Sequence, residues 1–268
     1  MKDILSEIIA DKHAEIDKLK ESVSIDMLYS LAEEHETISL REALESSKSG
    51  IISEFKRRSP SKGWINRAAN PTGIVPCYEK SGAAAISVLT DEKYFGGTLD
   101  DVLAVRPKVR IPILRKDFTI DEYQLHQARA AGADAVLLIA SALSPTDCRR
   151  LAAIVHELGL ETLLEVHNEN ELGYINDNID IVGVNNRNLG TFVTDTANSE
   201  ALAPKLPRTI TRISESGLKD ARTILRLRRL GFKGFLIGEQ LMKGENPAEE
   251  LRKLIDELEK SDAQTPQP

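Results

Sequence analysis

Residues 135–166 read AVLLIASALSPTDCRRLAAIVHELGLETLLEV, which divides into two apolar runs separated by a longer mixed segment. Val136-Leu137-Leu138-Ile139 and Leu163-Leu164 are continuous rather than alternating, as expected for strands whose two faces are both buried. Residues 145–158, between these runs, are long enough for the helix that connects two parallel strands. The stretch therefore predicts one strand–helix–strand unit of a parallel sheet.

Similar apolar runs recur along most of the chain. We predict eight strands, at Ile51–Lys56, Ala85–Thr90, Ile113–Lys116, Ala135–Ile139, Glu161–Val166, Ile181–Asn185, Thr211–Glu215 and Gly234–Gly238. Successive strands start between 20 residues (181 − 161) and 34 residues (85 − 51) apart, which leaves room for one helix in each gap, as at Asp121–Ala131 and Lys219–Leu230. Eight such units predict an α/β protein with the (β/α)8 TIM-barrel architecture. A doubly wound sheet is the alternative, but the first strand is followed by Arg57-Arg58-Ser59-Pro60 and not by a GxGxxG phosphate loop.

The two ends of the chain have a different pattern. Residues 2–22 predict an amphipathic helix, because their apolar residues recur near one face among acidic residues and lysines. Two short helices are expected at Met27–Ala32 and Ser39–Leu44, so residues 1–48 form an N-terminal helical extension to a single barrel domain that spans 49–260. The last helix starts near Asn246 and Pro247, and residues 261–268, which are small, polar and proline-bearing, are expected to form a disordered tail.

The composition argues against several classes of protein. Of the 268 residues, 41% are hydrophobic and 29% are charged, which is enough apolar material for one large core. With 35 Lys and Arg residues against 42 Asp and Glu residues, the net charge is −7, so we expect no nucleic-acid partner. No apolar run reaches the ~18 residues of a membrane-spanning helix, and Met1 to Lys20 lacks the apolar segment of a signal peptide. Cys77 and Cys148 have no CxxC spacing and the five histidines have no metal-ligand spacing, so we expect a cytoplasmic protein without a metal.

Ionisable residues occur where the predicted strands end, which is where TIM barrels place their active sites. Glu54 and Lys56 lie two apart at the end of the first strand, so both project to the same face. Lys116 ends the third strand, where a partly apolar barrel mouth can lower its pKa and make it a general acid. Glu165 is a lone carboxylate among four apolar neighbours in the fifth strand, where burial and a nearby lysine would tune its pKa. The structural alternatives are an ion pair that closes the barrel, a lysine at the rim, and a buried carboxylate satisfied by a lysine.

The later strands end in groups suited to anions and hydroxyls. Asn185 and Arg187 follow the sixth strand, and arginine suits bidentate binding of a carboxylate or phosphate. The pairs Ser216-Gly217 and Gly238-Glu239 follow the seventh and eighth strands, whose loops often form the phosphate site of a TIM barrel. His167, which follows the fifth strand, is expected to have a structural role.

Several strand ends belong to longer motifs. These are Ser39–Leu44 (SLREAL), Ile52–Gly63 (ISEFKRRSPSKG), Ile86–Asp91 (ISVLTD), Phe95-Gly96-Gly97, Leu114–Phe118 (LRKDF), Leu164–His167 (LEVH), Gly183–Leu189 (GVNNRNL) and Glu215-Ser216-Gly217. In this order, over roughly residues 2–258, they resemble the indole-3-glycerol phosphate synthase family. The Glu-x-Lys-x-x-Ser-Pro-Ser and Lys-Asp-Phe stretches are specific, and the whole set in order is a stronger signal than either stretch.

The resemblance implies a reaction that needs no cofactor, in which 1-(2-carboxyphenylamino)-1-deoxyribulose 5-phosphate is cyclised to indole-3-glycerol phosphate with loss of CO2 and water. It implies that Lys116 protonates the ketone oxygen and that Glu165 is the base of the dehydration. Lys56 would be a second acid or a contact to the substrate carboxylate, while Glu54 and Asn185 position the reacting groups. Substrate binding is assigned to Ser59, Phe118, Arg187, Glu215, Ser216, Gly217, Gly238 and Glu239, with the backbone N–H of Glu239, not its carboxylate, facing the phosphate.

Two other functions are compatible with a phosphate-binding barrel. An isomerase of tryptophan or histidine synthesis, such as phosphoribosylanthranilate isomerase, would use a Cys/Asp or Asp/Asp pair at its strand ends, whereas the first strand carries Glu54 and Lys56 and Cys77 lies elsewhere. A non-catalytic barrel that binds a phosphorylated ligand would lack the charged strand-end residues, all of which are present. We expect a phosphorylated small-molecule substrate, no membrane partner, and a monomer or weak homodimer.

Overall fold

Eight parallel strands close into a barrel, the architecture that the spacing of the apolar runs predicts. The computed structural model describes residues 4–31, 35–188 and 190–263. The barrel strands are β1 (Ile51–Phe55), β4 (Ala85–Leu89), β5 (Ile113–Lys116), β6 (Ala135–Ile139), β7 (Glu161–Val166), β8 (Ile181–Asn185), β9 (Thr211–Glu215) and β10 (Gly234–Ile237). They pair in this order around the ring, and β10 pairs with β1 to close it. All eight predicted strands are present, each ending within one residue of the expected position.

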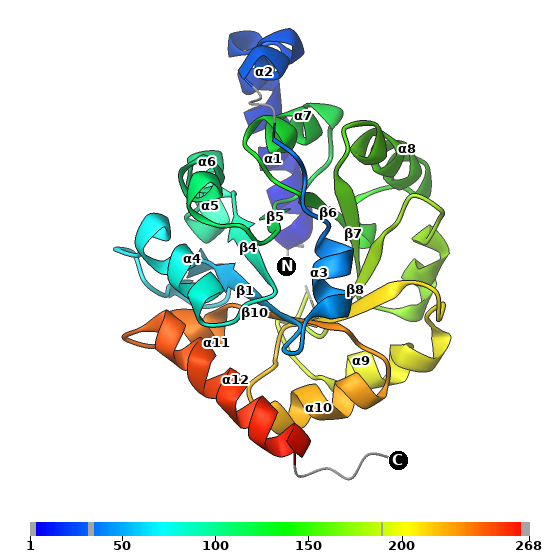
Figure 1. The fold of residues 1–268 in the computed structure, drawn as a ribbon. Helices are drawn as coiled ribbons and strands as arrows, with labels where there is room; N and C mark the ends of the chain where they lie inside the picture. The colour runs from blue at the N-terminus through cyan, green and yellow to red at the C-terminus, as the bar shows by residue number, and fades with distance from the viewer. Residues whose placement is uncertain (1–3, 32–34, 189, 264–268) are drawn as a thin grey trace.

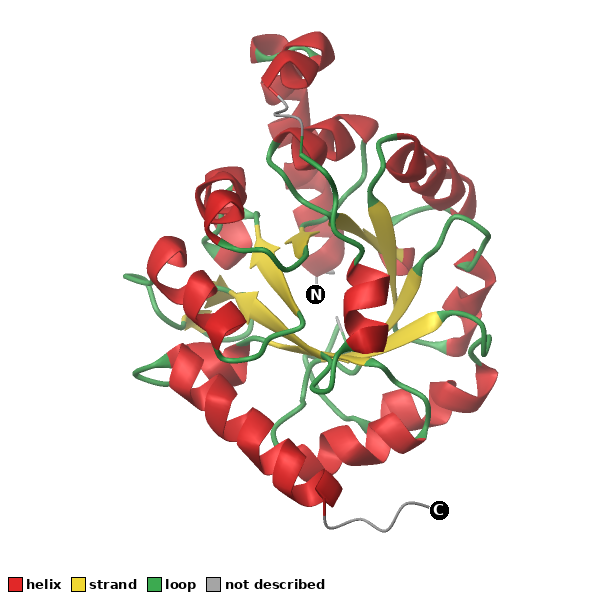
Figure 2. Cartoon of the chain, viewed as in Figure 1, coloured by secondary structure: helices red, strands yellow, loops and turns green. Residues whose placement is uncertain are grey.

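Helices surround the ring of strands, as Figure 2 shows in red and yellow. In the described ranges they are α1 (Ile4–Ser22), α2 (Ile25–Leu31), α3 (Leu40–Ser46), α4 (Pro71–Lys80), α5 (Glu92–Phe95), α6 (Leu99–Val105), α7 (Glu122–Ala130), α8 (Pro145–Glu157), α9 (Ala197–Leu202), α10 (Ala221–Arg229), α11 (Glu239–Met242) and α12 (Pro247–Ala263). The short 3-10 helices there are η1 (Arg106–Lys108), η2 (Ala140–Ala142), η3 (Glu169–Tyr174) and η4 (Ala203–Lys205). Within the described residues, none of these helices is both long and apolar enough to span a membrane.

Two details differ from the sequence-based expectation. The tail predicted from residue 261 starts too early, because α12 continues to Ala263, and residues 264–268 lie outside the described part of the chain. A small hairpin of β2 (Arg58–Ser59) and β3 (Gly63–Trp64), which the sequence analysis did not anticipate, follows β1.

The helix α8 illustrates why the connecting segments are helical. The Ser144 side chain accepts a hydrogen bond from the backbone N–H of Asp147 and so caps the N-terminus, and Pro145 occupies the first turn, where no N–H donor is needed. The buried positions follow the helical period, and they are Cys148, Leu151, Ala152 and Val155.

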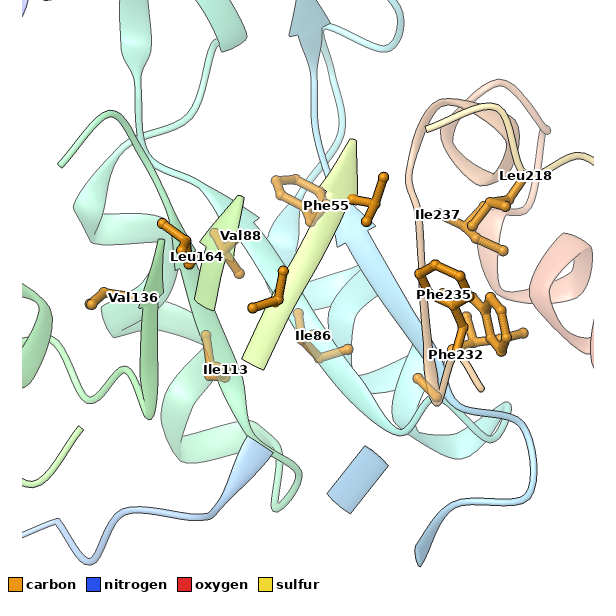
Figure 3. Packing of buried hydrophobic residues seen from close by; sticks show 14 of the residues in the cluster. Phe55, Ile86, Val88, Ile113, Val136, Leu164, Leu218, Phe232, Phe235 and Ile237 are labelled. Atoms are coloured by element: carbon orange, nitrogen blue, oxygen red, sulfur yellow. The ribbon is translucent and has the colours of Figure 1, made fainter. Parts of the chain in front are cut away.

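Alternate residues of each strand face opposite sides of the barrel wall. Leu164 and Val166 of β7 face outward and belong to the large hydrophobic core between strands and helices, part of which Figure 3 shows. Leu163 belongs instead to a separate cluster that contains residues from the other strands of the ring. Glu165 has the same parity as Leu163, so the pattern that buries the strand also directs this carboxylate into the barrel.

The N-terminal extension covers both ends of the barrel. Leu40 and Leu44 of α3 are 0% and 1% exposed and pack in the interior cluster against the N-terminal halves of the strands. In Figure 1, α3 lies in front of the ring of strands, and α1, drawn fainter with distance, lies behind it. Ile4, Leu5 and Ile8 of α1 line the cavity at the opposite, C-terminal end of the strands. The barrel mouth is therefore partly closed by the chain's first helix.

Candidate active site

A cavity of about 380 Å³ lies at the C-terminal ends of the barrel strands. This volume is in the range of small-molecule sites, and the position is where TIM barrels perform their chemistry. All thirteen predicted site residues line it, namely Glu54, Lys56, Ser59, Lys116, Phe118, Glu165, Asn185, Arg187, Glu215, Ser216, Gly217, Gly238 and Glu239. Residues from six different strands and the loops that follow them thus converge on one space, while the individual roles assigned to them stay predictions.

Lys116 lies between two buried carboxylates. Its Nζ is 3.0 Å from Oε2 of Glu165 and 3.5 Å from Oε2 of Glu215. The side chains of the two glutamates are only 3% and 2% exposed, and that of Lys116 is 13% exposed. In the described part of the chain, Oε1 of Glu215 has no hydrogen-bond partner. The three ends of β5, β7 and β9 therefore form a cluster with two acids and one ammonium.

The protonation states in this cluster follow from its charges. Burial alone would lower the pKa of Lys116, but the carboxylates of Glu165, Glu215 and Glu54 outweigh burial and raise it above its usual value. The expectation of a lowered pKa for Lys116 is therefore wrong. Burial would raise the pKa of Glu165, but the Lys116 ammonium and His167 lower it. The pKa of Glu215 is raised by burial and by the nearby negative charge of Glu165. At neutral pH the site therefore holds a charged lysine acid and an ionised glutamate base.

Two glycines make room for carboxylates in the barrel mouth. Oε1 of Glu54 accepts a hydrogen bond from Nζ of Lys56 at 2.6 Å, which confirms that these two side chains share one face. A Cβ at Gly238 would lie 2.3 Å from Oε1 of Glu54, and a Cβ at Gly183 would lie 2.1 Å from Oε1 of Glu215. Both separations are far below van der Waals contact, so glycine is required at these positions for the acids to point inward.

Cations and hydrogen-bond donors also line the cavity. Arg187 donates from Nη1 to Oγ of Ser61 at 3.0 Å, and its Nη2 lies 3.4 Å from Oε2 of Glu239. Lys243 contacts the other oxygen of Glu239 at 2.6 Å, so the Glu239 carboxylate is held by two cations. In the part of the chain that the structure describes, the buried Oγ of Ser59, a residue that lines the cavity, has no hydrogen-bond partner.

The loop after β9, which also lines the cavity, turns sharply. Ser216 and Gly217 have φ angles of 68° and 75°, both in the left-handed region, which is uncommon for a serine. Across the described ranges, no group of three or more His, Cys, Asp or Glu side chains is arranged to hold a metal ion. Backbone N–H groups and the cationic side chains of Arg187 and Lys243, which line the cavity, are groups that can bind an anion.

Other cavity residues were missed by the sequence analysis. Leu5, Ile8 and Phe95 line the cavity, and the rings of Phe95 and Phe118 pack with their centroids 6.1 Å apart, which gives the cavity an apolar side. Lys62, Lys219 and Lys243 add cations. Neither the apolar residues nor these lysines could be predicted from the strand ends. They lie on α1, on connecting loops and on short helices, which only the tertiary structure brings to the mouth.

The same applies to a buried ion-pair cluster that attaches α1 to the barrel. Lys12, which is 1% exposed, contacts Asp91 at 2.9 Å, Asp117 at 3.1 Å and Glu15 at 2.9 Å. Asp91 follows β4, and Asp117 is the residue after Lys116. A pattern of alternating charge along residues 2–22 gave no signal that one of these lysines would be fully buried.

The comparisons with known proteins agree on one family. The family model described as indole-3-glycerol phosphate synthase matches residues 5–254. A protein named indole-3-glycerol phosphate synthase from Bacteroides thetaiotaomicron is 57% identical over 256 residues, which cover 95% of this chain and 98% of that protein. One of the same name from Salinibacter ruber is 44% identical over 265 residues, which cover 97% of this chain and 98% of that protein.

Solved structures support the barrel. A mutant tryptophan synthase alpha-subunit from Pyrococcus furiosus superposes with a TM-score of 0.60 at 18% identity, covering 80% of this chain and 99% of that one. Identity this low shows the fold alone. The family model and the two close relatives over nearly the full length go further: the chain belongs to the indole-3-glycerol phosphate synthase family.

Proposed function

We propose that Lys116 and Glu165 are the acid and the base of the family's reaction in this chain. The chain is a carboxy-lyase of tryptophan biosynthesis, which converts 1-(2-carboxyphenylamino)-1-deoxyribulose 5-phosphate into indole-3-glycerol phosphate, CO2 and water. The observation that carries the assignment is the 3.0 Å contact between Nζ of Lys116 and Oε2 of Glu165 inside the cavity. The two groups have opposite protonation states at neutral pH, as an acid and a base require.

The steps of the reaction match the groups at the strand ends. As the aromatic carbon attacks the ketone, negative charge develops on the ketone oxygen, and the Lys116 ammonium stabilises and protonates it. CO2 then leaves from the cationic ring. Glu165 removes a proton in the dehydration, and Lys56, paired with Glu54, is placed to assist the leaving hydroxide or to contact the substrate carboxylate. Asn185 and Glu54 position these groups.

Substrate binding divides between the two sides of the cavity. We assign the phosphate to the side formed by Ser216, Gly217, Gly238 and the backbone N–H of Glu239, with Arg187 and Ser59 holding further anionic groups of the substrate. Glu215 would contact the reacting part, because its carboxylate lies 3.5 Å from Nζ of Lys116. The apolar side, which includes Phe118, suits the phenyl ring of the substrate.

The test is to supply the purified protein with the carboxyphenylamino-deoxyribulose phosphate and follow indole absorbance or fluorescence. Lys116→Ala and Glu165→Gln should each lower kcat by ~100-fold or more, the scale of a positioned general acid or base, while circular dichroism shows a folded barrel. Near wild-type turnover in either variant would contradict the proposed roles. A folded wild-type protein that yields no indole product would favour a non-catalytic barrel.

The isomerase alternative finds little support in the cavity. It needs a Cys/Asp or Asp/Asp pair at the ends of the first strand and the fifth or sixth, but Cys77 lies on α4, among the outer helices, and is not one of the residues that line the cavity. The first strand instead presents the Glu54–Lys56 pair. Offering phosphoribosylanthranilate as a second substrate would expose any isomerase activity.

We also propose that the enzyme acts in the cytoplasm as a monomer or weak homodimer. Both cysteines, Cys77 and Cys148, are free thiols, which suits a reducing compartment. Residues of α1 from the same chain line the cavity, so a second chain is not needed to complete its wall. Sedimentation at working enzyme concentrations tests the assembly, and a dimer that persists on dilution would contradict it.

A further inference from the structure

His167 connects the proposed base to a carboxylate outside the reaction cavity. Its Nε2 lies 3.3 Å from Oε1 of Glu165, and its Nδ1 lies 3.4 Å from Oε2 of Glu171. His167 is two residues beyond Glu165, so it continues the inward-facing side of β7 past the end of the strand. The imidazole therefore bridges two carboxylates, one on each side of it.

The outer carboxylate is held in a fixed position. Oε2 of Glu171, on η3, accepts a hydrogen bond from the backbone N–H of His167 at 2.6 Å, and its Oε1 accepts one from Nδ2 of Asn168 at 2.6 Å. Asn198 donates to the backbone carbonyl of His167 at 3.0 Å and fixes the residue from α9. These contacts hold the imidazole between the two acids.

The bridge also lies between two spaces. Glu165 lines the reaction cavity, whereas His167, Glu171 and Asn168 line a separate, more open depression next to it. The side chains of His167 and Glu171 are 11% and 13% exposed, so the outer end of the bridge reaches solvent. A proton that enters from the depression has a continuous path of ionisable groups to Glu165 and on to Lys116.

The reaction requires such an entry, a step that rests on the function proposed above. The ketone oxygen leaves as water and so takes up two protons. The carbon next to the nitrogen releases one proton to Glu165, and the carboxylate leaves as CO2 without releasing any. The carboxylate form of the substrate plus one proton therefore gives the product, CO2 and water. One proton must reach the cavity from solvent in every turnover, although α1 partly covers the mouth.

We propose that His167 relays this proton from the depression to Glu165. The imidazolium gives its Nε2 proton to Glu165, which leaves the neutral ring with its remaining proton on Nδ1. A flip of the ring then turns the deprotonated nitrogen toward Glu171, where it takes a new proton from water and restores the imidazolium. Glu165 passes the proton across 3.0 Å to Lys116 and restores the ammonium, which then supplies the second of the two protons that the ketone oxygen takes up. In the described part of the chain Nε2 has no aligned hydrogen-bond partner, so the ring turns toward Oε1 before the transfer. His167 acts through Glu165 and does not touch the substrate.

The charges around His167 fit a relay. Burial would lower its pKa, but Glu165 and Glu171 raise it to about 10, so the ring is protonated at neutral pH while Glu165 is ionised. When Lys116 has given up its proton, Glu165 loses its nearest cation and its own proton affinity rises. The transfer from His167 then becomes favourable at the moment when the site needs a proton.

The test is chemical rescue of His167→Ala with added imidazole at fixed pH and ionic strength. We expect kcat to fall by ~100-fold, the lower end of the range for one positioned proton transfer, with little change in KM. Added imidazole should raise kcat to a plateau. The matched control is His156→Ala, because His156 also pairs with a carboxylate, Asp180 at 2.9 Å, but lies on the outer helix α8. The kcat of His156→Ala should equal that of the wild type and should not change when imidazole is added.

Two further variants keep the outcomes separate. His167→Gln retains a hydrogen-bond donor of similar size but carries no titratable proton, and it replaces the alanine variant if that one does not fold. A relay predicts the same loss in kcat for both, whereas full activity in His167→Gln, or a loss that imidazole leaves unchanged in His167→Ala, would overturn it. If Glu165→Gln is as active as the wild type, Glu165 is not the base and the proposed function is contradicted. If Glu165→Gln is impaired but the His167 variants keep full activity, the proposed function stands and the relay through His167 is contradicted.

Discussion

Replacing Lys12 by methionine should loosen α1 from the barrel more than any other single charge removal on that helix. Lys12 is the central residue of the buried stripe of α1, which also contains Leu5, Ile8 and Ile16. Methionine retains the unbranched chain and good helix propensity but removes the ammonium. The buried carboxylates of Asp91 and Asp117 would then repel each other, because the ammonium that both of them contact is gone.

The magnitude follows from the burial of the two acids. Their side chains are 3% and 1% exposed, and removing one partner of a buried ion pair costs about 3–5 kcal/mol. Burial would raise the pKa of Asp117, but Lys12 and then Arg115 lower it from 3.8 to about 2, which corresponds to about 2.5 kcal/mol at 1.36 kcal/mol per pKa unit. Arg115 remains in the variant, so we expect a loss of about 3 kcal/mol.

Lys20→Met provides the control on the same helix. Lys20 also bridges to the barrel, at 2.7 Å from Asp121, but the two side chains are 41% and 30% exposed, so its removal should cost at most about 1 kcal/mol. Urea unfolding at neutral pH measures both losses, and amide hydrogen exchange shows whether α1 opens on its own. KM should rise in Lys12→Met, because Ile4, Leu5 and Ile8 line the cavity. Equal losses in the two variants, with equal exchange in α1, would refute the buried-pair argument.

Two further outcomes follow from the site. Gly183→Ala should displace the Glu215 carboxylate, since its Cβ would lie 2.1 Å from Oε1, and should lower kcat without unfolding the barrel; Gly73→Ala, where the Cβ meets no atom within 4 Å, is the control and should leave kinetics unchanged. The pKa of His167 is raised from 6.5 to about 10, so its stabilising contribution is fully present below pH 6.5 and is lost as pH rises toward 10. The difference in unfolding free energy between wild type and His167→Gln should therefore shrink from pH 6.5 to pH 10, and a constant difference would show that the ring's charge contributes nothing.

The barrel and the inner ring of the site could be predicted from local patterns. Continuous apolar runs identify strands buried on both faces, and the period of two then assigns each polar residue in a run to one face. Glu165 is the clearest case, because its parity with Leu163 directs it into the barrel. In a parallel barrel all strand ends meet at one mouth, so Glu54, Lys116 and Glu215 could be placed together without any knowledge of their distances.

The protonation states and the contacts outside the strands could not be predicted, because they depend on which charged side chains from different elements lie close together. The pKa of Lys116 was expected to fall because burial was considered without the three carboxylates that surround it. The burial of Lys12 and the positions of Phe95 and Lys243 arise from the packing of α1 and of loops, which have no fixed relation to the strand period. His167 was assigned a structural role because a single histidine after a strand gives no sign of the two carboxylates beside it.

The acid and the base of the site maintain each other's protonation state. Lys116 stays charged because Glu165 is ionised, and Glu165 stays ionised because Lys116 is charged, since both are too buried for water to stabilise either charge alone. Each time Lys116 gives a proton to the substrate oxygen, this support disappears and the proton affinity of Glu165 rises. Glu165 first takes the proton relayed by His167 and then, in the dehydration, the proton that the substrate loses. The same 3.0 Å contact then allows Glu165 to return that proton to Lys116. Lys116 and Glu165 thus return to their starting protonation states, provided that one proton enters from solvent in each turnover. That proton is the one assigned to the path through His167.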